Sequence, residues 1–102
     1  MQRITDKQLD NLATWLNEIT GSPTEYSHRD ESGHFRANIG NYHISRAYGG
    51  VCLHRVVNEG GGVKCPIVGG HIPKRELFEQ MHAYIKGLLD AKELTKQEEM
   101  TA

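Results

Sequence analysis

The sequence predicts one small α+β domain, with an N-terminal helix, a three- to four-stranded antiparallel β-meander and a C-terminal helix packed on one face of the sheet. Three observations favour this class. Apolar residues recur at helical spacing near both ends of the chain. Between these segments they alternate with polar residues, as in strands with one buried face, and glycine-containing turns separate the alternating runs. The 102 residues fit one domain, placed at residues 1–94 and followed by a disordered tail at 95–102.

The N-terminal helix is expected to begin after Thr5 and to end at Gly21. Thr5 and Gln8 have the spacing of a capping box, in which each side chain bonds the backbone N–H of the other residue. Glycine readily adopts the left-handed conformation that ends many helices, and Pro23 cannot continue one. The apolar stripe expected to face the core consists of Leu9, Leu12, Leu16 and Ile19.

The C-terminal helix is expected to begin at Pro73, because proline suits the first helical position. Its apolar periodicity ends near Leu94, which predicts the disordered tail. The residues of this helix that are expected to reach the core are Phe78, Met81, Ile85 and Leu88.

Four segments between the helices are the candidate strands of the sheet. They are Tyr26–Arg29, His34–Ile39, Tyr42–Tyr48 and Val51–Val57, with turns at Asp30–Gly33, Gly40–Asn41 and Gly49–Gly50. Glycine at the first central position favours a type II′ hairpin at Gly40–Asn41. Phe35, Ile39 and Leu53 are expected on the buried face.

The glycine-rich segment Asn58–Gly70 is expected to be a flexible loop with a short edge strand at Lys64–Val68. Its consecutive glycines expose backbone N–H groups, yet they lack the sequence of a phosphate-binding loop. We therefore expect this loop to become ordered on a macromolecular partner, and we expect the change of its three consecutive glycines to alanine to leave the fold intact. The predicted contact residues here are Asn58, Glu59, Gly60, Gly61 and Gly62.

The 12 basic and 13 acidic residues give a formal net charge of −1, which argues against broad, sequence-independent binding to nucleic acid. A local basic patch is still compatible with this balance. Its candidate residues are Arg46, Arg55, Lys74 and Arg75, with Tyr42, His43 and Tyr48 as neighbouring stacking surfaces. Such a patch supports nucleic-acid binding as an alternative function.

Two cysteines and two histidines raise the question of a metal site. Cys52-x-His54 and Cys65-x5-His71 lack the ligand spacing of the usual structural zinc sites, so no metal and no other cofactor is expected. No catalytic residue is assigned, because no nucleophile signature surrounds either cysteine; a small metal- or thiol-dependent enzyme is the second alternative. The N-terminus lacks the apolar core of a signal peptide and no run of about 18 apolar residues occurs, so we expect a cytoplasmic protein without a membrane contact.

Several segments resemble small proteins encoded in the accessory regions of tailed phages and prophages. They are Thr5–Leu9, Leu16–Pro23, Arg36–His43, Tyr48–Val51 and Asn58–Gly62. The resemblance implies a non-catalytic binding module that modulates or inhibits a host protein or nucleoprotein, with no catalytic residues to carry over. The order of helix, strands and helix also resembles the double-stranded-RNA-binding domain, in which basic residues at the start of the second helix, here Lys74 and Arg75, contact phosphates.

Overall fold

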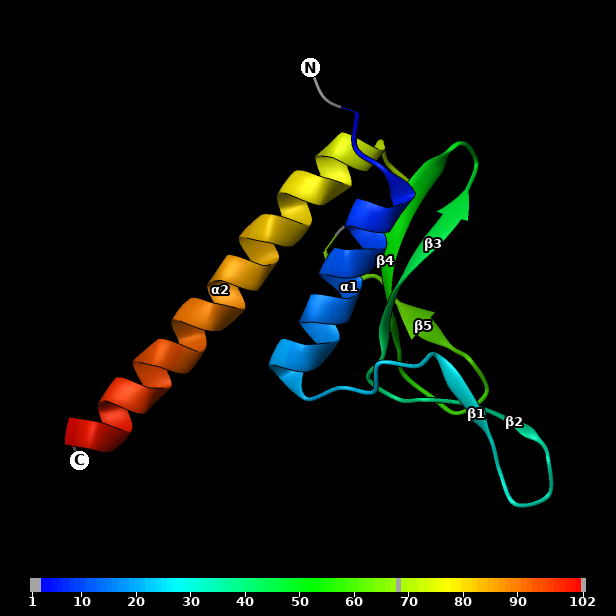
Figure 1. Cartoon of the computed structure of the whole chain (residues 1–102), viewed down its shortest axis with the longest axis horizontal. Helices are drawn as coiled ribbons and strands as arrows, with labels where there is room; N and C mark the ends of the chain where they lie inside the picture. The colour runs from blue at the N-terminus through cyan, green and yellow to red at the C-terminus, as the bar shows by residue number, and fades with distance from the viewer. Residues whose placement is uncertain (1–2, 68, 102) are drawn as a thin grey trace.

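A computed structural model describes residues 3–67 and 69–101 and confirms the α+β class (Figure 1). The described elements, in chain order, are α1 (Asp6–Thr20), β1 (Ser27–Arg29), β2 (Phe35–Ala37), β3 (Tyr42–Ala47), β4 (Gly50–Val56), β5 (Val63–Lys64) and α2 (Lys74–Thr101). Both helices lie on one side of the sheet formed by β3, β4 and β5. The β1–β2 hairpin projects away from the helices, at the lower right of Figure 1.

The strands form two antiparallel sheets rather than the single expected meander. In the first sheet β1 pairs with β2, and in the second β4 lies between β3 and β5. The expected type II′ hairpin at Gly40–Asn41 is wrong, because β2 and β3 do not pair. Instead, the Asn41 N–H donates to the Asn38 carbonyl (3.1 Å), and Gly40, with φ 94°, fills the position that requires a positive φ in a type II turn.

The β3–β4 hairpin closes one residue earlier than predicted. Ala47 pairs with Gly50, so the two-residue turn consists of Tyr48 and Gly49. Both have a positive φ, 55° and 74°, as a type I′ turn requires. Tyr48 therefore stands at the tip of the hairpin, where its side chain is 97% exposed.

The ends of α1 are formed as the sequence predicts. The Gln8 N–H donates to Thr5 Oγ1 (3.2 Å), and the Thr5 N–H donates to Gln8 Oε1 (2.8 Å). Gly21 adopts the left-handed conformation (φ 68°) that ends the helix. These contacts join residues close in sequence, so a local pattern is sufficient to predict them.

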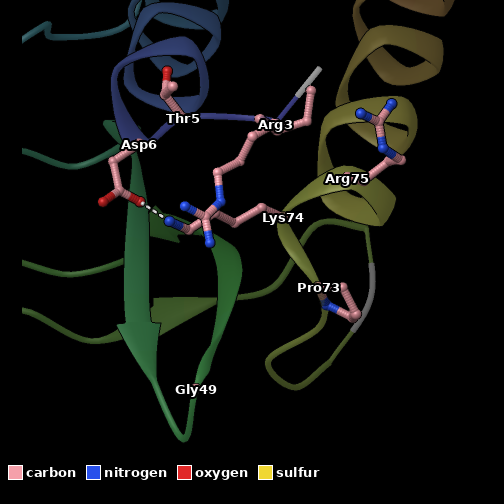
Figure 2. A pocket seen from close by; sticks show the side chains of 8 residues that line it. Arg3, Thr5, Asp6, Gly49, Pro73, Lys74 and Arg75 are labelled. Atoms are coloured by element: carbon pink, nitrogen blue, oxygen red, sulfur yellow. Dashed lines mark ion pairs between the residues drawn. The ribbon is translucent and has the colours of Figure 1, made fainter. Parts of the chain in front are cut away.

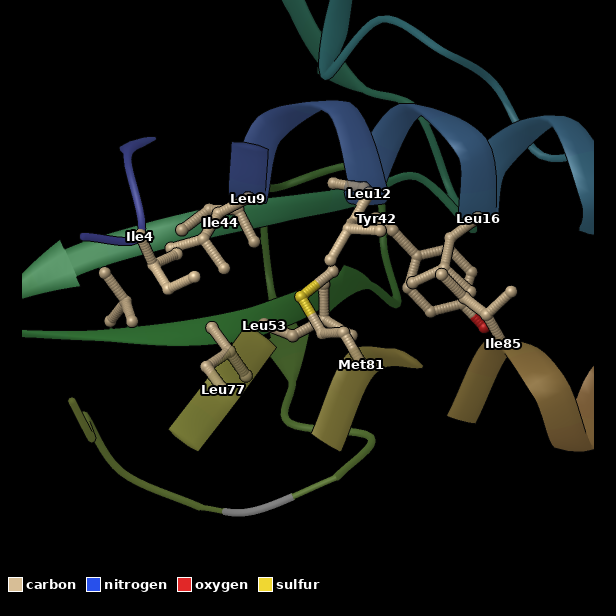
Figure 3. Close-up of a cluster of buried hydrophobic side chains, with 12 residues drawn as sticks. Ile4, Leu9, Leu12, Leu16, Tyr42, Ile44, Leu53, Leu77, Met81 and Ile85 are labelled. Carbon is tan, nitrogen blue, oxygen red and sulfur yellow. The ribbon is translucent and has the colours of Figure 1, made fainter. Parts of the chain in front are cut away.

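The core lies between the two helices and the sheet face that they cover (Figure 3). Its central side chains are Leu9, Leu12 and Leu16 from α1, Tyr42, Ile44, Val51 and Leu53 from the sheet, and Leu77, Met81 and Ile85 from α2. Ile19, Phe78 and Leu88, also predicted in the core, are partly buried against this cluster. The predictions for Phe35 and Ile39 are wrong: these residues are 39% and 55% exposed. Phe35 belongs to the first sheet, which projects away from the helices, and Ile39 lies in the segment between β2 and β3.

A buried asparagine joins α1 to the edge of the sheet. Asn17 is 2% exposed, its Nδ2 donates to the Tyr42 carbonyl (3.0 Å), and its Oδ1 accepts from the Tyr42 N–H (2.7 Å). Among the described residues no strand pairs with the outer side of β3, so this side-chain amide takes the place of a neighbouring strand. These two hydrogen bonds determine where α1 lies along β3, because buried backbone groups require a partner.

α2 continues to Thr101, whereas the loss of periodicity predicts a disordered tail from residue 95 onward. Residues with good helix propensity can extend a helix that already exists without an apolar face of their own. Lys92 Nζ donates to the Ile19 carbonyl near the end of α1, so the two helices are in contact shortly before this extension. Residue 102 lies outside the described residues. In the described part of the chain, neither helix has a stretch long and apolar enough to cross a membrane.

Replacing Asn17 with alanine is expected to lower the free energy of unfolding by about 2–3 kcal/mol, because the buried N–H and carbonyl of Tyr42 both lose their partner. Asn11→Ala is the matched control, since Asn11 lies on the exposed side of the same helix. Urea denaturation of the two variants measures the difference. Equal free energies of unfolding would contradict the role given to Asn17.

Candidate functional site

The face of the β3–β4–β5 sheet turned away from the helices carries ring, thiol and hydroxyl side chains, and we call it the second face. Successive residues of a strand point to opposite faces. Because Ile44 belongs to the core, its neighbours His43 and Ser45 point to the second face. Across the strands His43 is paired with His54 and Ser45 with Cys52, so all four share this face.

Six rings follow one another across the second face, and we call them the ring row: Phe35, Tyr26, His43, His54, His71 and Tyr48. In that order, successive ring centroids lie 6.0, 4.7, 5.6, 6.2 and 5.7 Å apart. The last four contacts are edge to face, an arrangement that aromatic rings favour. Tyr48 is 97% exposed at one end, and Tyr26 is 40% exposed near the other. The row is therefore accessible at both ends and partly buried in the middle.

Two histidines in the middle of the ring row, His43 and His54, have lowered pKa values. Burial lowers the pKa of His43, and the neighbouring His54 lowers it further. Burial also lowers the pKa of His54, with a second contribution from His71. Adjacent imidazoles repel one another when both are protonated, so the neutral forms of His43 and His54, with nitrogen lone pairs, are favoured here.

Cys52, His54 and Cys65 converge at the centre of the second face. The donor atoms of the three side chains all lie within 4.8 Å of one another, and the Cys52 thiol donates to Cys65 Sγ at 3.3 Å. Burial, followed by the hydrogen bond to Cys65, raises the pKa of Cys52 to about 11, so its thiol is protonated. His71 lies beside the three, with its ring 6.2 Å from that of His54 and its Nε2 3.1 Å from Ser45 Oγ.

Sequence spacing argues against a metal site here, yet the structure brings three of the four candidate ligands together. The reason is the register of two strands. β5 pairs with β4 through Arg55↔Lys64 and Val56↔Val63, so the next residue along the chain, Cys65, arrives beside His54. Spacing rules for zinc describe ligands that one local turn brings together, whereas this grouping depends on strand pairing.

The glycine segment between β4 and β5 is a hydrogen-bonded turn rather than the expected flexible loop. Asn58 Oδ1 accepts from the N–H groups of Gly60 (3.0 Å) and Gly62 (2.9 Å), and the Asn58 carbonyl accepts from the Gly61 N–H (3.2 Å). A Cβ atom on Gly62 would collide with the side-chain amide of Asn58. The strand that follows is β5, which is shorter than the expected edge strand; residue 68 lies outside the described residues.

This turn lies against the Tyr26 end of the ring row. A Cβ atom on Gly61 would lie 3.3 Å from Tyr26 Oη, so the bare backbone approaches the ring closely. The Glu59 carboxylate is 3.7 Å from Arg36 Nε of β2, which joins the turn to the first sheet. The predicted contact segment Asn58–Gly62 and the ring row therefore form one continuous surface.

Part of the predicted basic patch gathers at the start of α2, where it meets acidic side chains. Arg46 Nε and Lys74 Nζ each lie 3.1 Å from Asp6 Oδ1, and Arg46 also contacts Asp10 at 2.9 Å. The hydrogen bond from Lys74, followed by that from Arg46, lowers the pKa of Asp6. Figure 2 shows the ion pair of Lys74 with Asp6 in the pocket that Arg75 also lines. The cations here are partly neutralised by the carboxylates beside them.

Arg55 lies at the other end of the β3–β4 pair, opposite Tyr42, while Arg46 is opposite Val51. The guanidinium carbon of Arg55 is 4.8 Å from the centroid of the Tyr42 ring, and Arg55 Nε donates to the Gly40 carbonyl at 3.3 Å. Tyr42 is 2% exposed and belongs to the core, so it is not a stacking surface for a ligand. The structure therefore divides the predicted basic patch between two places.

The sequence does not predict Tyr26 or Phe35 on the candidate surface, and the alternation of Phe35 with polar residues is that of a core residue. For the remaining residues the signal is the polar half of the strand alternation, which sets His43 and Ser45 on the face opposite the core. Comparisons with models of protein families, with curated proteins and with solved structures find no match.

Gly61→Ala is expected to lower the free energy of unfolding by about 1–2 kcal/mol, because a φ of 98° is strained for any residue with a Cβ atom. Gly60→Ala is the control, since its φ lies outside the left-handed region and its Cβ would make only an ordinary contact with Asn58. Chemical denaturation of both variants measures the difference. Equal stability of the two would restore the expectation that these glycines serve flexibility rather than the turn.

Proposed function

We propose that this protein is a non-catalytic binding module that uses the second face to bind a host protein in the cytoplasm. The observation that carries the proposal is the ring row together with the adjoining turn at Asn58–Gly62. The resemblance to accessory proteins of tailed phages implies the same kind of role, in which the bound host protein or nucleoprotein is modulated or inhibited.

Tyr48 is the strongest single support for a binding role. A bulky residue with a positive φ is unfavourable, and the first position of a type I′ turn favours asparagine or glycine. With 97% exposure, its ring gains almost no burial within the fold. Tyrosine is also among the residues that contribute most to binding at protein interfaces. A costly residue that gains so little burial within the fold suggests a benefit in a complex.

The adjoining turn supports a protein partner rather than a bound anion. The N–H groups of Gly60, Gly61 and Gly62 are all donated to Asn58, so they do not form a cradle for a phosphate. The backbone of Gly61, which carries no Cβ atom, nevertheless lies close beside Tyr26. Such a surface suits close contact with another polypeptide.

Nucleic-acid binding, the alternative function, has less support from the arrangement of charges. Arg46 and Lys74 share the carboxylate of Asp6, and Arg55 lies at the other end of the strand pair. Backbone recognition of nucleic acid depends on cations that can replace counterions along several phosphates. The net charge of −1 adds no general attraction to a polyanion.

An apolar groove between the two helices is the competing docking surface. Trp15 and Leu89 line it, and these side chains are 41% and 40% exposed. The ring row and the turn at Asn58–Gly62 both belong to the second face, so we favour that face over the groove. A Trp15 variant tests the groove.

Wild-type protein used as bait in a bacterial lysate is expected to capture a protein partner, with or without nuclease treatment. Tyr48→Asn is expected to weaken that capture by about fivefold or more, because loss of a tyrosine that anchors an interface costs more than about 1 kcal/mol of binding free energy. Asparagine tolerates the positive φ at this position, so the turn is retained. The control Trp15→Gln is expected to bind as the wild type does, and titration of the recovered partner measures each affinity.

Two outcomes would contradict the proposal. Capture that disappears after nuclease treatment would favour the nucleic-acid alternative. If Trp15→Gln abolishes capture and Tyr48→Asn leaves capture unchanged, the interface lies in the groove between the helices. Circular dichroism of each variant confirms that a loss of binding is not a loss of fold.

A further inference from the structure

We propose that Cys52, His54, Cys65 and His71 bind one zinc ion that fastens the segment after β5 to strand β4. The inference rests on the convergence of Cys52, His54 and Cys65 on the second face, with His71 beside them. It does not depend on the identity of any macromolecular partner.

The donor set is that of a structural zinc site. Two thiolates and two imidazoles form one of the common tetrahedral sets for this ion, and thiolate ligands disfavour magnesium and calcium. With bond lengths of about 2.3 Å to sulfur and about 2.1 Å to nitrogen, tetrahedral zinc places its donor atoms about 3.5–3.8 Å apart. The donor atoms of Cys52, His54 and Cys65 all lie within 4.8 Å of one another, and the two sulfurs are 3.3 Å apart. Movements of about 1 Å or less therefore bring these three side chains into the zinc-bound geometry.

His71 is placed to supply the fourth ligand. Its ring centroid is 6.2 Å from that of His54, and its Nε2 is hydrogen-bonded to Ser45 Oγ at 3.1 Å. Ser45 is the cross-strand partner of Cys52, so this bond keeps the imidazole beside the thiol. Metal-binding histidines commonly bond one ring nitrogen to a second group while the other nitrogen binds the metal.

The two cysteines can supply the charge that balances a divalent cation, because their sulfur atoms lie 3.3 Å apart. Zinc binding displaces one proton from each thiol and leaves two thiolates around Zn²⁺, so the overall charge of the site is unchanged.

The ion would join segments that few other described contacts hold together. Cys52 and His54 belong to β4, Cys65 follows β5, and His71 precedes the bridge between Ile72 and Val51. Four protein ligands leave no open coordination position, so the site would stabilise the second face rather than catalyse a reaction. Because the ligands are brought together only in the folded chain, part of the zinc-binding free energy becomes stability of the fold.

The test measures zinc and cobalt binding to the full chain purified under reducing conditions. We expect one equivalent of zinc after dialysis, and a melting temperature that falls by several degrees when a chelator removes it. Cobalt(II) should give a thiolate-to-metal charge-transfer band and the visible bands of a tetrahedral site. Cys65→Ser is expected to lower zinc affinity by at least about a hundredfold, since even the loss of a residue that only orients a ligand costs about 10–100-fold. His34→Gln is the control, because the His34 side chain is 70% exposed and outside the cluster.

The proposal is overturned if reduced wild-type protein binds no more zinc than Cys65→Ser, or if cobalt gives no charge-transfer band. The second measurement uses wild-type protein alone, so it remains decisive even if the variant fails to fold. A Cys52–Cys65 disulfide that persists under mild reductant, with no metal bound, would also overturn it. If His71→Ala binds zinc as tightly as His34→Gln does, the assignment of the fourth ligand is wrong.

Discussion

The packing of both helices on one face of the β3–β4–β5 sheet is the constraint on which the rest of the structure depends. α1 is held to the edge of β3 by the two hydrogen bonds between Asn17 and the Tyr42 backbone. α2 covers the same face of the sheet, and its Met81 is fully buried in the core with side chains of α1 and the sheet. The apolar side chains that β3 and β4 direct toward the helices are thereby buried. The two helices leave the opposite face of the sheet uncovered.

No described helix covers that second face, and its side chains differ accordingly. Cys52 and Val56 are each 1% exposed there, so the face is packed locally even without a helix. Other positions carry imidazole and tyrosine rings and the Ser45 hydroxyl, which can pack against one another and still offer polar atoms. This chemistry suits two uses of one surface: ring edges and the glycine turn for a macromolecular partner, and the central sulfur and nitrogen donors for a metal ion.

Features determined by local sequence could be predicted, and features determined by strand register could not. The capping box at Thr5 and the left-handed end at Gly21 depend on neighbours within a few residues, so their patterns were sufficient. Phe35 alternates like a core residue, but its position depends on the first sheet pairing separately from the second. The convergence of Cys65 with His54 likewise depends on the pairing of β5 with β4, and no spacing along the chain expresses that pairing. Asn58 shows a third case, since its side chain converts an apparently flexible glycine run into a bonded turn.

The most direct test of the account is to ask which face of the protein touches its partner. A photo-crosslinking phenylalanine derivative can replace Tyr26, on the second face, or Trp15, beside the helices; both side chains are about 40% exposed, so they are equally accessible to a probe. Irradiation in lysate is expected to give a covalent adduct with one host protein from position 26 and none from position 15. An adduct from position 15 alone would contradict the central claim that the second face is the working surface.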